Sequence, residues 1–142
     1  MAASIGYDQV EIGDELPAQS FALHRLDLVR YAGASGDFNV IHWNQRVAQA
    51  VGLPDVIAHG MLTMAEAIRV VTDWAGDPAA VTEYGVRFTR PVPVPDDGAG
   101  ATLVVSGAVT EKLDERRMKV ELKATSGDQK VLGMARALVR LA

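Results

Sequence analysis

The sequence predicts an α+β fold in which an antiparallel sheet wraps around one long helix. Three observations lead to this class. One long apolar helical pattern spans residues 60–75, and at least four strand-like segments follow between residues 80 and 141. The segments are joined by short connections, which suit an antiparallel sheet. We therefore expect the helix to lie against the sheet.

Length and composition indicate an ordinary globular domain. The 142 residues suffice for one domain with its own core, and 49% hydrophobic and 23% charged residues are usual for such a domain. The chain has no cysteine, which excludes disulfides, thiolate metal sites and a cysteine nucleophile. The net charge is −4 and the basic residues are scattered, so a nucleic-acid partner is not expected.

The N-terminal twenty residues carry acidic side chains and no apolar run long enough for a signal peptide. No stretch in the sequence reaches the roughly 18 apolar residues of a membrane span. We therefore expect a cytoplasmic protein with no membrane partner.

The first half of the chain contains short elements. Residues 20–23 are a strand candidate, and a short helix is expected from about residue 26 to 32, ended by Gly33 and Gly36. A second short helix is expected within residues 44–52, with an asparagine to cap its first turn and a glycine to close it.

The helix predicted at residues 60–75 has apolar residues around most of its circumference. Its charged residues Glu66, Arg69 and Asp73 are spaced by three and four positions and share one narrow stripe. We expect the remaining surface of this helix to be buried.

The second half of the chain is strand-like. The segment 116–126 alternates apolar residues at even positions from 118 to 124 with charged residues between them, which is typical of a strand with one wet face. Prolines at 91, 93 and 95 predict an extended connector or a sheet edge. The four expected strands are 80–90, 101–112, 116–126 and 130–141.

The stretch YAGASGDFNVIHWNQ (31–45) places three polar side chains, Asp37, Asn39 and His42, in a glycine-flanked segment that is otherwise apolar. Such a segment is expected to fold back and line a pocket. Histidine exchanges protons readily near neutral pH, and a nearby carboxylate shares such work. The alternative is that Asp37 and Asn39 are turn residues that bond their own backbone.

The same stretch resembles the motif Gly-Asp-x-Asn-Pro-hydrophobic-His of the MaoC-like dehydratases and (R)-specific enoyl thioester hydratases, with Val40 in place of the proline. The segment AHGMLTM (58–64) resembles the start of the central helix in that family. Residues 75–98, AGDPAAVTEYGVRFTRPVPVPDDG, resemble the B subunits of actinobacterial (3R)-hydroxyacyl-carrier-protein dehydratases. The resemblance implies a hot-dog fold in a single domain over residues 1–142.

The resemblance also implies roles for residues. Asp37 and His42 would be the catalytic pair, the backbone N–H of Gly60 would stabilise an oxyanion, and Asn39 would support the loop or a water molecule. No metal and no organic cofactor is implied. His59 is expected to be a hydrogen-bonded neighbour of the helix cap rather than a catalyst.

The activity implied is reversible dehydration of (3R)-hydroxyacyl thioesters to trans-2-enoyl thioesters in fatty-acid elongation. The substrate would be an acyl-carrier-protein or coenzyme A thioester, and the chain would be the catalytic subunit of a heterodimer with a related hot-dog subunit. Two alternatives stay open. One is a homodimeric (R)-specific enoyl-CoA hydratase, and the other is a non-catalytic subunit that binds acyl thioesters.

Overall fold

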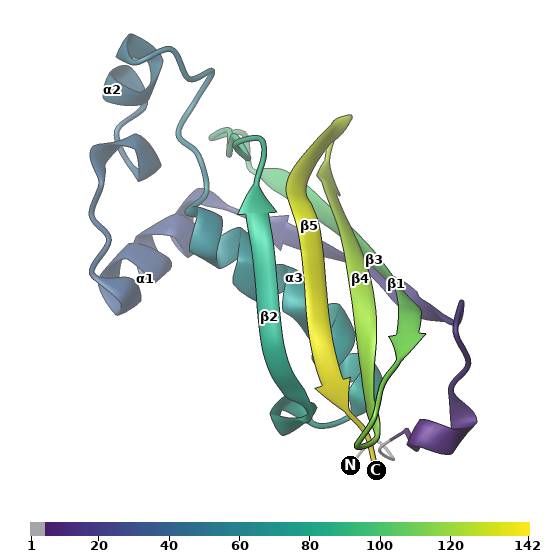
Figure 1. Cartoon of the computed structure of the whole chain (residues 1–142). Helices are drawn as coiled ribbons and strands as arrows, with labels where there is room; N and C mark the ends of the chain where they lie inside the picture. The colour runs from purple at the N-terminus through teal and green to yellow at the C-terminus, as the bar shows by residue number, and fades with distance from the viewer. Residues whose placement is uncertain (1–4) are drawn as a thin grey trace.

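The protein forms a five-stranded antiparallel sheet with one long helix against it, as seen in a computed structural model that describes residues 5–142 (Figure 1). The strand order is β1-β3-β4-β5-β2. Helix α3 contacts all five strands, so the predicted fold class is confirmed. The strands are β1 (Glu15–Leu23), β2 (Val81–Phe88), β3 (Ala101–Lys112), β4 (Arg117–Ser126) and β5 (Gln129–Arg140), the helices are α1 (Arg25–Ser35), α2 (Gln45–Ala50) and α3 (Gly60–Ala75), and the 3-10 turns are η1 (Tyr7–Gln9), η2 (Val40–His42) and η3 (Pro78–Ala80).

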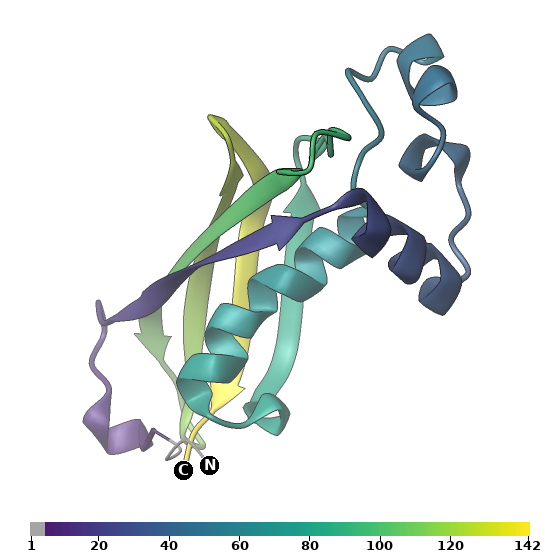
Figure 2. The ribbon, with the colours of Figure 1, turned by 180° about the vertical axis from the view of Figure 1, so that it is seen from behind.

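Helix α3 has the predicted bounds, but it is less buried than its sequence pattern suggests. The sheet covers one side only, and Figure 2 shows the other side of α3 in front of the sheet. Met61 is exposed and Leu62 is only partly buried, so the expectation that all but a narrow stripe would be buried is wrong. The residues that are buried follow the helical repeat and are Thr63, Ala67, Val70, Val71 and Ala75.

The charged stripe of α3 lies where it was predicted, away from the buried side. Arg69 and Glu66 form an ion pair with a 2.7 Å separation, and the Asp73 carboxylate accepts a hydrogen bond from Gln19 of β1 at 3.1 Å. Each helix in residues 5–142 is too short or too polar to span a membrane.

The four C-terminal strands are confirmed to within one or two residues, and the alternation in β4 is clean. Its apolar residues from 118 to 124 are buried and face the core, whereas Glu121 and Lys123 are exposed. Strand β1 starts at Glu15, five residues before the predicted strand. This extension depends on pairing with β3, and the pairing is interrupted by an irregularity between Leu16 and Gln19, next to Pro17.

The short helices end where local chemistry dictates. Gly36 is the C-cap of α1 with φ of 79°, a left-handed conformation that favours glycine. Gly33, also expected to end this helix, lies inside it. Asn44 caps α2, because its side chain accepts a hydrogen bond from the Val47 N–H at 3.1 Å.

The proline-containing connector between β2 and β3 fixes the entry into α3. The Ala58 N–H donates to the Val92 carbonyl at 2.9 Å, and the Val94 N–H donates to the Val56 carbonyl at 2.8 Å. An isolated antiparallel bridge joins Ile57 to Pro93. This confirms the extended connector and holds the residues just before α3 in one position.

We expect Tyr84→Phe to lower the free energy of unfolding by about 1 kcal/mol. The Tyr84 hydroxyl of β2 donates to the Met64 carbonyl of α3 at 2.8 Å, and burial raises the pKa of this phenol, so it stays a neutral donor. Urea denaturation measures the change. Thr82→Val is the matched control, since the exposed Thr82 hydroxyl bonds the Leu138 carbonyl where water can replace it. Equal stability of wild type and Tyr84→Phe would contradict the expectation.

Candidate active site

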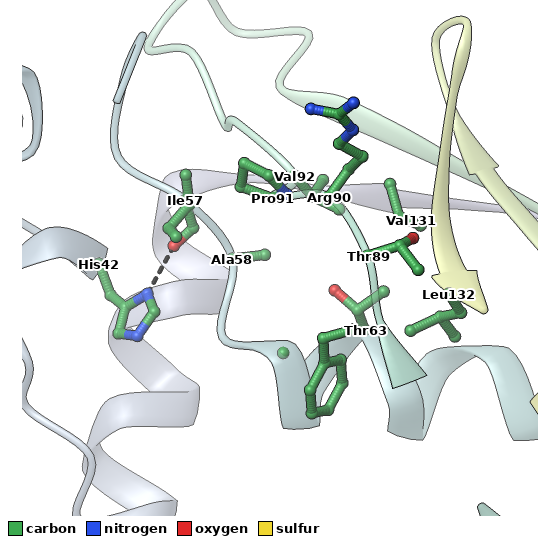
Figure 3. Close-up of a pocket in the computed structure, with 12 residues that line it drawn as sticks. His42, Ile57, Ala58, Thr63, Thr89, Arg90, Pro91, Val92, Val131 and Leu132 are labelled. Carbon is green, nitrogen blue, oxygen red and sulfur yellow. Dashed lines mark hydrogen bonds between the residues drawn. The ribbon is translucent and has the colours of Figure 1, made fainter. Parts of the chain in front are cut away.

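A pocket of about 380 Å³ opens beside the N-terminus of α3 (Figure 3). Its walls come from the loop after α1, the start of α3, the connector after β2, and β5. Most of the lining is apolar, which suits an apolar ligand that carries a few polar groups. The lining residues are His42, Ile57, Ala58, Gly60, Thr63, Phe88, Thr89, Arg90, Pro91, Val92, Val131 and Leu132.

His42 ends the 3-10 turn η2 and is 7% exposed. Its Nδ1 lies 2.7 Å from the Ile57 carbonyl oxygen. A carbonyl oxygen only accepts, so Nδ1 carries a proton and donates it. In the neutral ring Nε2 is then unprotonated. This nitrogen lies 3.8 Å from Oδ2 of Asp37.

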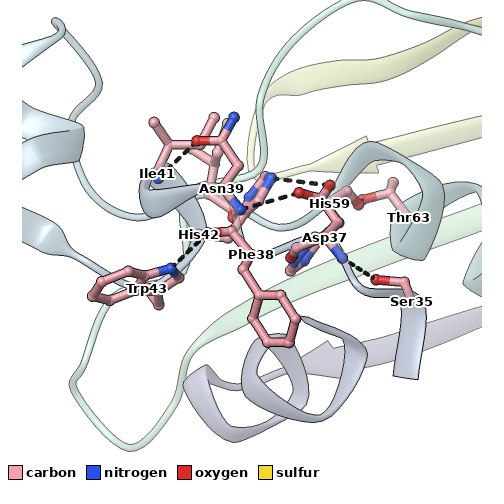
Figure 4. A network of polar contacts seen from close by, with 10 residues as sticks. Ser35, Asp37, Phe38, Asn39, Ile41, His42, Trp43, His59 and Thr63 are labelled. Atoms are coloured by element: carbon pink, nitrogen blue, oxygen red, sulfur yellow. Dashed lines mark hydrogen bonds and ion pairs between the residues drawn. The ribbon is translucent and has the colours of Figure 1, made fainter. Parts of the chain in front are cut away.

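Asp37 lies in the loop that follows α1, and its side chain is 51% exposed. Its N–H donates to the Ser35 hydroxyl, and its Oδ1 accepts from the Asn39 N–H, both at 3.1 Å (Figure 4). Asn39 caps η2, since its side-chain oxygen accepts from the Ile41 N–H at 3.3 Å. Both residues therefore make turn contacts, as the alternative interpretation predicted, and Oδ2 of Asp37 still faces His42.

Gly60 is the first residue of α3. The first backbone bond of the helix runs from the Thr63 N–H to the His59 carbonyl at 3.1 Å, so the N–H groups of residues 60–62 precede any helical acceptor. A Cβ at position 60 would lie 3.1–3.3 Å from three atoms of the Phe88 ring. The lack of a side chain leaves this N–H accessible from the pocket, where the helix dipole also favours negative charge.

His59 belongs to the same cluster, although the sequence indicated only a helix-cap neighbour. It is the N-cap residue of α3, yet its side chain makes no capping bond and is 1% exposed. The ring stacks on His42 with centroids 3.8 Å apart, and Nε2 lies 3.1 Å from the Asp37 carbonyl oxygen. Burial lowers the pKa of His59 and outweighs the opposite effect of the Asp37 carbonyl.

The structure thus brings three predicted site residues together and places the fourth beside them. His42 and Gly60 line the pocket, Asp37 is not a lining residue but faces His42, and Asn39 caps the turn η2 that carries His42. The sequence signal that could have pointed to His59 is its position directly before Gly60.

Asp37, His42 and His59 each offer a ligand atom within 4.8 Å of the others. The two rings are stacked with an interplanar angle of 23°. Imidazole lone pairs lie in the ring planes, so stacked rings do not direct them at one ion. One nitrogen of each ring also donates to a carbonyl. This geometry suits proton transfer better than metal ligation.

The chain as a whole is similar to known proteins. A family model described as MaoC like domain matches residues 9–128. A Mycobacterium tuberculosis protein named 3-hydroxyacyl-thioester dehydratase X is 42% identical over 79 residues, which are 56% of this chain and 27% of that protein. A Rhodospirillum rubrum protein named (R)-specific enoyl-CoA hydratase is 36% identical over 87 residues, which are 61% of this chain and 60% of that protein.

Among solved structures, one titled MaoC-like dehydratase superposes with a TM-score of 0.94 and 41% sequence identity. The match covers 98% of this chain and 43% of that chain. The chain therefore spans less than half the length of this structure and about a quarter of the Mycobacterium tuberculosis protein.

We expect Val40→Pro to raise the free energy of unfolding by about 0.4–1 kcal/mol, because proline removes freedom from the unfolded chain. Val40 is the first residue of η2, a position that proline tolerates, and no hydrogen bond from its N–H is seen in residues 5–142. Asn39, with ψ of 127°, lies outside the α region that is disfavoured before proline. Val47→Pro is the matched control and should destabilise, since it removes the N–H that donates to the capping side chain of Asn44 at the start of α2. Urea denaturation midpoints compare the two variants. A lower midpoint for Val40→Pro than for wild type would refute this reasoning.

The lowered pKa of His59 predicts a pH-dependent stability. Above the ordinary histidine pKa of 6.5, His59 is neutral in both the folded and the unfolded chain, so its titration contributes nothing to the free energy of unfolding. Below 6.5 the unfolded chain binds a proton more readily, so the folded state loses stability as the pH falls toward the lower folded pKa. The charged or titratable groups that face the ring are Asp37, His42 and Tyr31.

His59→Phe removes this titration. We expect the unfolding free energy of wild type to fall relative to that of His59→Phe as the pH drops through 6.5. Urea denaturation at a series of pH values measures both. Parallel curves for the two proteins would show that His59 titrates alike in the folded and unfolded chains.

Proposed function

The chain belongs to the MaoC-like domain family, and from this premise we propose that it catalyses the reversible dehydration of (3R)-hydroxyacyl thioesters to trans-2-enoyl thioesters. One observation carries the proposal. His42 Nε2 faces the Asp37 carboxylate at 3.8 Å, beside the unbonded helix N-terminus at Gly60, on an apolar pocket. The names of the Mycobacterium tuberculosis and Rhodospirillum rubrum relatives, a dehydratase and a hydratase, support the same chemistry.

The reaction has three requirements, and the site offers a group for each. A proton must leave C2, the C3 oxygen must receive a proton as the C3–O bond breaks, and the thioester oxygen must be stabilised while it carries negative charge. Asp37 and His42 supply the acid and the base, so that one takes the C2 proton while the other protonates the departing hydroxyl. Water leaves, and hydration runs the same steps in reverse.

Gly60 meets the third requirement. Its N–H lies at the positive end of the α3 dipole and has no helical acceptor, so it can donate to the thioester oxygen. The absence of a side chain allows the carbonyl to approach the backbone closely. Asn39 holds the turn that carries His42 and is a supporting residue in this proposal.

The pocket suits the acyl chain of such a substrate. Its walls beyond His42 and Gly60 are mainly aliphatic, with Val92, Val131 and Leu132 among them. The similarity of residues 75–98 to B subunits of carrier-protein dehydratases favours an acyl-carrier-protein thioester and a role in fatty-acid elongation. We propose the cytoplasm as the compartment, in which such carriers are found with their substrates.

A second unit of the same fold is part of this proposal. Four apolar side chains around the site are each more than half exposed, which is more than an isolated chain usually leaves in water at one place. The similar solved chain is more than twice as long as the match to it. We propose that a related hot-dog subunit covers this surface, in a heterodimer. The exposed residues are Phe38, Trp43, Met61 and Phe88.

The second candidate is a homodimeric (R)-specific enoyl-CoA hydratase with the same chemistry. The Rhodospirillum rubrum relative carries that name, and the match covers 60% of it. A non-catalytic thioester-binding subunit is the third possibility. The arrangement of Asp37, His42 and Gly60 weighs against it, because a subunit that only binds does not need an acid–base pair at the pocket.

We expect the purified protein, alone or with its partner subunit, to hydrate crotonyl-CoA and longer enoyl thioesters. Loss of absorbance of the conjugated thioester follows the reaction. Asp37→Asn and His42→Ala should each lower kcat/KM by about 10²–10⁴-fold, because each removes one proton-transfer group.

Two matched variants control for the type of substitution. Asp128→Asn and His24→Ala change the same residue types at exposed positions that do not line the pocket, and both should keep wild-type rates. Activity without a partner would favour the homodimeric hydratase. Turnover by neither the protein alone nor the protein with its partner, despite binding of the thioester, would establish the non-catalytic role.

A further inference from the structure

We propose that His59 is a positioning residue that holds Asp37 and His42 in their reactive arrangement, an inference that rests on the proposed function. No reacting atom needs to touch His59 for this role. It acts through contacts with both members of the pair.

His59 restrains the backbone of Asp37. The His59 Nε2–H donates to the Asp37 backbone carbonyl at 3.1 Å, while the Asp37 N–H is held by Ser35 and its Oδ1 by the Asn39 N–H. Three of the four polar atoms of Asp37 are thereby fixed, and Oδ2 is left toward His42. Without the bond from His59, the carbonyl end of this peptide unit would lose its restraint.

His59 also restrains the ring of His42. Its Nδ1 is anchored on the Ile57 carbonyl, and its face stacks on His59 at a centroid distance of 3.8 Å. One hydrogen bond allows the ring to tilt about the bonded nitrogen, whereas the stack restricts that tilt. Tyr31 packs on His59 with centroids 4.7 Å apart, so the stack is supported by α1.

The protonation state of His59 suits this positioning role. Nε2 of His59 is the protonated nitrogen because a carbonyl accepts from it, and Nδ1 is buried without a hydrogen-bond partner in the described chain. A second proton on this ring would place a charge in the interior, and burial together with His42 disfavours that charge by more than Asp37 favours it. If the His59 ring stays neutral, it can stack on His42 whether His42 is neutral or protonated. A proton-transfer cycle requires this, because His42 passes through both states.

His59 also connects the acid–base pair to the start of α3. His59 directly precedes Gly60, and its own carbonyl accepts the first backbone bond of α3 from Thr63. One residue therefore joins the oxyanion donor, through its backbone, to the acid–base pair, through its side chain. Errors in the relative position of such groups are costly, because displacement of a reacting group by about 1 Å can lower a rate about 10²-fold.

The first experiment needs no turnover. Long-range ¹H–¹⁵N NMR spectra of the wild-type protein report the protonation and tautomer of each histidine across a pH titration. We expect His59 to stay neutral, with the proton on Nε2, at pH values around the ordinary histidine pKa of 6.5. Protonation of both ring nitrogens of His59 in that range, or a single proton on Nδ1, would overturn the proposal.

The second experiment separates the two contacts. His59→Phe keeps a ring on His42 but loses the donor, and His59→Gln places an amide N–H near the position of Nε2 but loses the stack. We expect each to lower kcat by about ten- to a hundredfold with a small change in KM. The pH profile of kcat/KM should also shift, which a change in overall stability alone does not produce.

His24→Phe is the matched control and should retain the wild-type rate and pH profile. Full kcat and an unchanged pH profile in both His59 variants would overturn the positioning role. If either variant fails to fold, the other variant and the wild-type spectra still decide. Inactivity of the wild-type protein both alone and with its partner subunit would refute the proposed function instead, and the NMR result would stand independently of it.

Discussion

The packing of α3 against one face of the sheet is the constraint on which the site depends. Small side chains at Ala67 and Ala75 let the helix approach the strands closely, and Val70 and Val71 fill the space between them. The position of the helix N-terminus is then determined by the connector, whose backbone bonds hold residues 56–58. Since the N-terminus carries the free N–H groups, the helix packing decides where negative charge can be stabilised.

The acid–base pair is built from residues in different surroundings. His42 is buried, and its ring is restrained by the hydrogen bond at Nδ1 and by the stack on one face. In contrast, half of the Asp37 side chain is in contact with water. In the proposed reaction, a bound thioester displaces that water. Interactions between charged groups strengthen when water leaves, so the pair would reach its working strength only with substrate present.

Features of the fold and the site that have a local cause could be predicted from the sequence. The bounds of α3, the Asn44 cap and the end of α1 at Gly36 follow from helix periodicity and capping chemistry within a few residues. The extension of β1 to Glu15 could not be predicted, because it depends on pairing with β3 more than eighty residues later. The motif placed Asp37 and His42 together, but His59 comes 22 positions after Asp37, and only the fold stacks it on His42.

The extent to which α3 is buried, which the sequence overestimates, bears on assembly. Periodicity counts every apolar residue as core, whichever chain covers it. The sheet here covers one side of α3, and Met61 and Phe88 stay exposed next to Gly60. In the proposed assembly, the subunit that buries these side chains would also remove water from the open side of the pocket. The hydrophobic gain of association and the desolvation of Asp37 would then come from the same contact, so that assembly itself would complete the site.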